Sequence, residues 1–375
     1  MSIEKGRISS RQATFLIANE ILATGILFLP ALMAREAGHD AWASVLIAAV
    51  FGLVLGALVV SLGLRFPEKN LVEYAIELLG PWGGRALGIL FGLFFFYLNG
   101  IIIREFGELL VSVVMPETPL VVFNALLVAM AVYGVYLGLE VFARVSEIVF
   151  PFSLLVSLFM LSLALPEMDF FQLKPVLVHS FSHILRGAGS LFAFFGEGIV
   201  FAMFLPYLRR PEDARRVNLQ VIFLLVVMIS LTVLGVTALF GAEETARLVF
   251  PTFDLAKTVR LGGFLERMES LVVGVWVSAV GLKVMVIYYA AALAFAQSFN
   301  LSDYRPLVLP GGVILVALSI LEFTDIIHLR EFLARFWGPL GITVQGGIPL
   351  LLFFLALIRK KGITNQGGRK NEENI

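Results

Sequence analysis

Residues 21–30 read ILATGILFLP and lie in the middle of an apolar run that extends from about residue 13 to residue 34. The run is long enough for a membrane-spanning helix, which needs about 20 mostly apolar residues. Thr24 and Gly25 stand at its centre, although both are weaker helix formers than the leucines around them. The stretch therefore predicts a membrane helix that is interrupted near its midpoint.

The composition sets the class of protein. Hydrophobic residues make up 59% of the chain and charged residues 15%, whereas soluble domains have about 45–50% and 25%. The sequence therefore predicts a polytopic membrane protein. A formal net charge of zero argues against a nucleic-acid partner, because such a partner requires a concentrated positive face. The absence of cysteine excludes disulfides and thiolate metal sites, and we expect neither a metal nor another cofactor.

The apolar runs are too long for barrel strands, so the predicted fold is all-α. We expect ten transmembrane helices, at about 13–34, 42–64, 86–110, 119–138, 145–165, 187–208, 217–240, 268–296, 306–321 and 337–358. If both termini are cytoplasmic, the inner segments hold 17 Lys and Arg residues and the outer segments hold 9. The positive-inside rule therefore favours cytoplasmic termini.

Ten helices divide into two sets of five, and an odd number per set turns the second set upside down relative to the first. This is the inverted-repeat plan of many secondary transporters. We expect one transmembrane domain over 1–361, with repeats at about 11–165 and 186–358, followed by a disordered cytoplasmic tail over 362–375.

The first helix of each half carries a predicted break at its midpoint, at residues 23–25 in the first and at Gly196-Glu197-Gly198 in the second. An unwound midpoint frees backbone N–H groups that attract a carboxylate and carbonyl groups that accept an ammonium. The pair of breaks therefore predicts a site for a zwitterionic amino acid. The candidate ligand-binding residues are Ala23, Thr24, Gly25, Ile26, Tyr97, Phe195, Gly196, Glu197, Gly198 and Tyr288.

Other interpretations of these residues remain open. Glycine in a membrane helix commonly serves close helix packing. Glu197 could cap the following half-helix rather than bind a ligand or carry a proton. Tyr97 and Tyr288 could be core aromatics in a chain that contains 34 phenylalanines.

Ionisable groups inside the predicted helices are costly in lipid and usually face the protein interior. We expect Glu20, Glu105 and Lys283 to be linked to ions or protons. Arg104 and Glu108 have the i, i+4 spacing of a helical pair and would bind each other. Lys283 could instead extend its ammonium to the membrane surface.

Four segments resemble the spore germination permease family, which supplies the B subunit of nutrient germinant receptors. They are RISSRQATFLIANEILATGILFLP near the start, DFFQLKPVL before the sixth predicted helix, FPTFDLAKTV after the seventh and FLERMESLVVGVW at the start of the eighth. The resemblance covers nearly the whole chain and places it in the amino acid–polyamine–cation transporter superfamily.

The resemblance implies a LeuT-like 5+5 fold in the inner membrane of a spore. It also implies two partners, a second polytopic subunit and a lipoprotein subunit, and a small nutrient ligand that is often an amino acid. In a LeuT-like arrangement the first and eighth helices hold a coupling sodium ion. We expect Lys283 to replace that ion and to pair with Glu20 or an unwound carbonyl, so that function does not depend on sodium.

Two functions remain after this reasoning. The first is a germinant-sensing, permease-like subunit, and the alternative is a proton-coupled amino acid permease. An enzyme is not expected, because no grouping with nucleophile–base geometry is visible at membrane depth.

Overall fold

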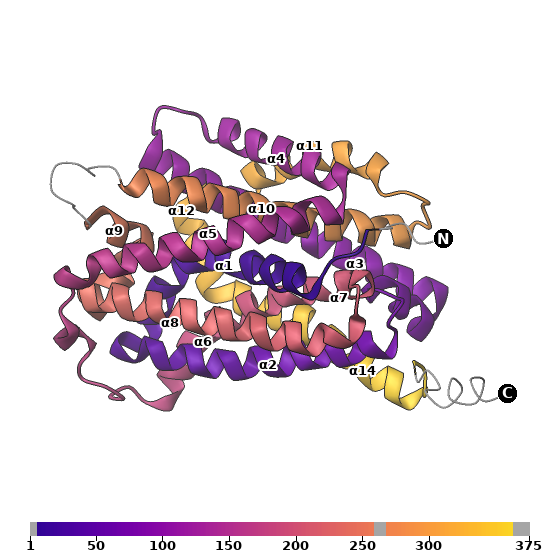
Figure 1. Cartoon of the computed structure of the whole chain (residues 1–375), viewed down its shortest axis with the longest axis horizontal. Helices are drawn as coiled ribbons and strands as arrows, with labels where there is room; N and C mark the ends of the chain where they lie inside the picture. Colours follow the sequence, from indigo (N-terminus) through magenta and orange to yellow (C-terminus); the bar gives the residue numbers. More distant parts are fainter. Residues whose placement is uncertain (1–5, 259–267, 363–375) are drawn as a thin grey trace.

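A computed structural model describes residues 6–258 and 268–362, and its long helices lie side by side in one bundle (Figure 1). The predicted disordered tail lies outside the described residues, except for Gly362. The α-helices are α1 (Ser10–Ala37), α2 (Ala41–Arg65), α3 (Leu71–Leu109), α4 (Leu120–Leu137), α5 (Leu139–Ala164), α6 (Phe181–Gly196), α7 (Phe201–Phe204), α8 (Ala214–Arg247), α9 (Pro251–Thr258), α10 (Met268–Ser298), α11 (Arg305–Leu321), α12 (Ile326–Phe332), α13 (Gly338–Gly341) and α14 (Ile348–Ile358).

The chain is an integral membrane protein. Within the described residues, eight helical segments are long and apolar enough to cross a membrane. One of them, Ser10–Arg65, contains both α1 and α2, and the 17-residue α11 is shorter than the others. Each predicted helix falls on helical residues, but the sixth covers α6, η5 and α7 and the tenth covers α13, a π-helical turn and α14. The number of membrane crossings stays a prediction. The start of α1 and the end of α14 lie at the same end of the bundle (Figure 1).

Helix α1 lies at the centre of the bundle and packs against α5, α6, α8 and α10. Ser9 begins the helix with a capping box, in which its hydroxyl accepts the Gln12 N–H and the Gln12 side chain accepts the Ser9 N–H. The helix ends before Gly38, whose φ of 54° suits a residue without a side chain. Almost all residues between Leu16 and Ala37 are buried, so α1 can serve as the wall of an internal site.

The predicted unwinding of α1 at residues 23–25 is wrong, because the chain is α-helical throughout Ser10–Ala37. Gly25 instead allows a close approach to α6, since a Cβ atom there would lie 3.2 Å from the Phe194 ring. The structure therefore gives this glycine a packing role, and its ligand-binding role stays a prediction. The second predicted break coincides with a change of helix type: α6 ends at Gly196 and a 3₁₀ turn, η5, follows over Glu197–Val200.

Two carbonyl groups of α1 accept side-chain donors from outside the helix. Pro30 has no N–H, so it cannot donate to the carbonyl of Ile26 four residues earlier. The Thr252 hydroxyl of α9 donates to that oxygen over 2.6 Å. One turn earlier, Trp276 Nε1 of α10 donates to the carbonyl oxygen of Ala23 over 2.7 Å. Side chains of neighbouring helices therefore use the main-chain polarity that we expected a ligand to use.

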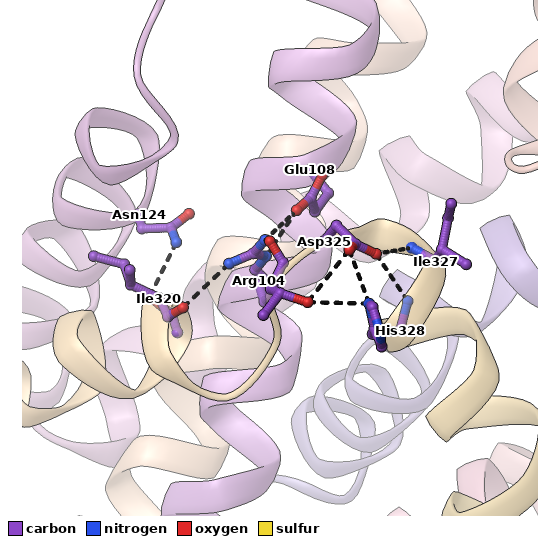
Figure 2. A network of polar contacts seen from close by, with 9 residues as sticks. Arg104, Glu108, Asn124, Ile320, Asp325, Ile327 and His328 are labelled. Carbon is purple, nitrogen blue, oxygen red and sulfur yellow. Dashed lines mark hydrogen bonds and ion pairs between the residues drawn. The ribbon is translucent and has the colours of Figure 1, made fainter.

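Arg104 of α3 holds the turn between α11 and α12 (Figure 2). Its guanidinium donates a hydrogen bond to the Glu108 carboxylate over 2.8 Å. It also donates to the carbonyl oxygens of Ile320 and Thr324 over 3.3 and 3.1 Å. These are carbonyls at and just beyond the end of a helix, which has no backbone donors for its last turn. The predicted Arg104–Glu108 pair is thus confirmed. On the other side of the turn, the Asp325 carboxylate begins α12 by accepting hydrogen bonds from the N–H groups of Ile327 and His328.

Candidate functional site

A cluster of ionisable side chains lies where α1, α3, η5 and α10 meet. Lys283 of α10 donates from Nζ to Glu197 Oε2 over 2.7 Å and to the Thr24 hydroxyl over 3.0 Å. Glu20 and Glu105 also act electrostatically on the Lys283 ammonium. All five residues are buried, so they meet inside the protein and not at the lipid surface. We call these residues the charged cluster.

The local structure explains how each side chain reaches the cluster. Glu20 and Thr24 are four residues apart in α1, and this spacing places both on one face of the helix. The Asn19 side chain ties α1 to α10 by donating to the carbonyl of Ala279 over 2.9 Å. Asn99 ties α3 to α10 in the same way, through the carbonyl of Val284 beside Lys283. These two hydrogen bonds from asparagine side chains join α10 to α1 and to α3.

The charges of the cluster do not balance when every group is ionised, because three carboxylates face one ammonium. Uncompensated buried charge is strongly unfavourable, so the remaining carboxyl groups must hold protons or face a cationic guest. The Lys283 ammonium pairs with Glu197, whereas neither carboxyl oxygen of Glu20 has a hydrogen-bond partner. Glu20, with both oxygens unpartnered, and Glu105, whose Oε2 also has no partner, are therefore the groups of the cluster with capacity for a proton or an ammonium.

The pairing of Lys283 differs from the expected one. We expected Glu20 or an unwound carbonyl of the first helix as its partner, and the structure has Glu197 and the Thr24 hydroxyl instead. The reason is that α1 remains helical, so its carbonyls near Thr24 are not released. The alternative in which Lys283 reaches the membrane surface is wrong, since its side chain is 0% exposed.

The structure gathers some candidate residues in the charged cluster and places the others elsewhere. Thr24, Glu197, Glu20, Glu105 and Lys283 come together. Ala23 and Ile26 line a cavity of about 100 Å³ on the side of α1 that faces α5, α8, α9 and α10. Phe195 and Gly198 line a smaller one of about 20 Å³ between α1, α2 and α8. Neither Thr24 nor Glu197 lines either of these two cavities.

The remaining candidates make packing contacts. Tyr97 contacts the Phe332 ring edge to face, with ring centroids 6.0 Å apart. Tyr288 donates its hydroxyl to the Val308 carbonyl of α11. Gly196 lies against the Gln345 side chain and leaves no room for a Cβ atom. For these residues the structure gives a packing role, and a ligand-binding role stays a prediction.

Sequence reasoning missed Trp276 and Thr252, which bind α1 carbonyls, and the two asparagines that position α10. Pro30 was the available signal for Thr252, because a proline inside a helix always leaves one carbonyl without its donor. It also missed Gln345, whose buried amide has no partner and which lies in a π-helical turn over 342–347. Nothing in the sequence around Gln345 indicates its contact with Gly196.

Comparisons with known proteins identify the family of the chain. The family model described as spore germination protein matches residues 7–326. Spore germination protein KB of Bacillus subtilis (strain 168) is 29% identical, and the alignment covers 96% of this chain and 97% of that protein. Spore germination proteins YndE and A2 of the same strain are 24% and 22% identical, and each alignment covers 95% of this chain and 98% or 97% of the relative.

A solved structure shows the same fold. The crystal structure of MhsT in complex with L-phenylalanine matches with a TM-score of 0.59 at 13% identity and covers 95% of this chain and 99% of that one. The fold is therefore the LeuT-like fold of that transporter. The relatives support a germination protein over the alternative of an ordinary permease. Because the family model matches most of its length, the chain belongs to the spore germination protein family.

Proposed function

We propose that this protein is the permease-like B subunit of a spore germinant receptor and that it senses a small zwitterionic nutrient, with an amino acid as the expected class. The observation that carries the proposal is the charged cluster, which lies at the centre of a fold shared with an amino acid–bound transporter structure. The family match supplies the germination role.

The charges of the cluster suit both ends of an amino acid. The unpartnered carboxyl group of Glu20 would accept the nutrient ammonium, which also offsets the excess of negative charge. The Lys283 ammonium, freed in part from Glu197, would face the nutrient carboxylate, and the Thr24 hydroxyl would add a hydrogen bond. Because Thr24, Glu197 and Lys283 are buried and bonded to one another, binding at this place requires α1 and η5 to separate.

That movement would be the signal. A ligand shifts a conformational equilibrium only if it binds one state better than the other, and this nutrient would favour the separated state. We place the subunit in the spore inner membrane with both termini in the cytoplasm. The change of conformation would be transmitted to a second polytopic subunit and a lipoprotein subunit.

The test is a thermal shift of the purified protein against amino acids, nucleosides and sugars. A ligand at 100 times its dissociation constant stabilises the protein by about 2.7 kcal/mol. We expect an amino acid to give this shift and Glu20→Gln to remove it, because a neutral amide cannot compensate the nutrient ammonium. The matched control is Glu117→Gln, the same change at an exposed glutamate, which should keep the full shift.

Two outcomes would contradict the proposal. An unchanged shift in Glu20→Gln would place the ligand away from the charged cluster. Proton-driven accumulation of the nutrient in liposomes that contain only this subunit would favour the permease alternative.

A further inference from the structure

The cavity beside α1 differs from the proposed nutrient site in the residues that line it. Its walls come from α1, α5, α8, α9 and α10, and none of the described residues that line it is charged. Its volume of about 100 Å³ is several times the roughly 10–15 Å³ that one water molecule needs. A zwitterion could not be compensated there, so the nutrient and this cavity do not match.

Most polar groups in the walls are already paired. The Asn19 amide, the Thr252 hydroxyl and the Trp276 indole N–H each donate to a backbone carbonyl. Thr232 likewise donates to the carbonyl of Met228 in its own helix. The buried hydroxyl of Ser153 on α5 differs, because it has no partner. The cavity thus presents apolar walls together with the unpartnered buried hydroxyl of Ser153 and the hydroxyl of the half-buried Ser157.

A groove on the outside of the bundle leads toward the cavity. It lies between α5 and α10, has a volume of about 340 Å³ and shares Ser153 and Val275 with the cavity wall. Apolar side chains such as Ile148 and Phe152 are exposed along it, as expected for a surface that faces lipid. At Gly274 of α10 a Cβ atom would have no neighbour within 4 Å, so the groove is open at that point.

We propose that this cavity is a second binding site, separate from the charged cluster, for small uncharged molecules that are mostly apolar and carry one hydrogen-bonding group. The guest enters from the bilayer through the groove between α5 and α10. Its apolar part contacts the walls around Trp276 and Met160, and its polar group bonds the Ser153 hydroxyl. Apolar protein cavities are known to bind small apolar molecules such as benzene, and this supports the proposed class of ligand.

The first experiment measures the melting temperature in detergent with and without benzene. We expect benzene to raise the melting temperature of the wild type. Ser157 lines the cavity from α5, and Ser157→Leu fills it, so this rise should be lost in the variant. Ser162→Leu is the matched control, because it makes the same change on the exposed face of the same helix, outside the cavity and the groove. Ala279→Leu fills the cavity from α10 and should behave like Ser157→Leu.

An equal benzene shift in the wild type and both filled variants would overturn the proposal, because it would mean that benzene acts on the micelle or elsewhere on the protein. If one filled variant does not fold, the other still decides the question. Absence of any shift in the wild type and in Ser162→Leu would overturn it as well.

The second experiment tests the polar group with phenol and benzene. Ser153→Ala should weaken phenol binding about 2- to 10-fold, the equivalent of one net hydrogen bond, and leave benzene binding unchanged. Equal losses for both probes would exclude the bond to Ser153. Glu20→Gln, the variant that should remove the nutrient shift, should keep benzene binding, whereas loss of benzene binding in folded Glu20→Gln protein would show that the two sites are one. Failure of the nutrient proposal would leave these expectations unaffected.

Discussion

Lys283 and Glu197 form an ion pair of 2.7 Å in which neither side chain is exposed by more than 1%. They come from α10 and from the 3₁₀ turn that follows α6, so both residues belong to the second half of the predicted repeat. The link to the first half is the Thr24 hydroxyl, together with the nearby carboxyl groups of Glu20 and Glu105. The cluster therefore depends on contacts between halves that no local sequence pattern determines.

Replacing Lys283 with an uncharged residue should destabilise the protein strongly. Lys283→Met leaves Glu197 buried without a partner, and the loss of one member of a buried pair costs about 3–5 kcal/mol. The double variant Lys283→Met/Glu197→Gln should recover part of that loss, because no uncompensated charge remains at this pair. Thermal unfolding in detergent measures both effects.

An exposed pair provides the control for this measurement. Lys257 and Asp254 of α9 lie 3.3 Å apart, and their side chains are 45% and 28% exposed. Lys257→Met should therefore cost no more than about 1 kcal/mol. If Lys283→Met is equally mild, the central pair does not carry the electrostatic role that we give it.

We expect nutrient binding to be independent of sodium. The Lys283 ammonium already supplies a positive charge next to α1, hydrogen-bonded to Thr24, where a coupling cation would otherwise compensate the carboxylates. Replacing sodium with N-methyl-D-glucamine at constant ionic strength should leave the nutrient-induced thermal shift unchanged. A shift that rises steeply with sodium would mean that Lys283 does not take the place of a cation.

Pro30 and Thr252 should be energetically coupled through the carbonyl of Ile26. Thr252→Val removes the donor that replaces the missing proline N–H, and we expect a loss of about 1 kcal/mol, whereas Thr252→Ser should keep the bond. In a Pro30→Ala background the helix can supply its own donor from residue 30, so Thr252→Val should cost less. Thermal unfolding of the four variants gives the coupling energy by a double-mutant cycle, and strictly additive effects would contradict this account.

The sequence predicted the helices well and their central contacts only in part. Long apolar runs and the positions of glycine and proline mark helices whatever their neighbours are, which is why each predicted helix is present. Whether Thr24-Gly25 unwinds a helix depends on its surroundings, and here α1 stays helical where Phe194 and Lys283 contact it. Burial of Glu20, Glu105 and Lys283 together followed from the cost of charge in lipid, but the choice of Glu197 as partner required the three-dimensional packing.

Glu322 should make stability depend on pH. It lies in the turn between α11 and α12, outside the predicted membrane helices, beside Gly100 and near Tyr97. Burial raises the pKa of its carboxyl group from 4.5 to about 8, and neither oxygen has a hydrogen-bond partner. Between these two values the folded protein holds a proton that the unfolded chain has released. Its contribution to stability is therefore complete below about pH 4.5 and is lost as the pH rises through about 8.

The measurement is the melting temperature in a nonionic detergent from pH 5 to pH 8.5. The slope from this group is at most about 1.4 kcal/mol per pH unit, because one proton is involved. Glu322→Gln keeps the shape of the side chain and removes its titration, so this variant should lose less stability over the range than the wild type. Glu117→Gln, at an exposed position, should follow the wild-type profile. Identical profiles for the wild type and Glu322→Gln would show that the carboxyl group beside Gly100 is already ionised in the folded protein, which its unpartnered oxygens argue against.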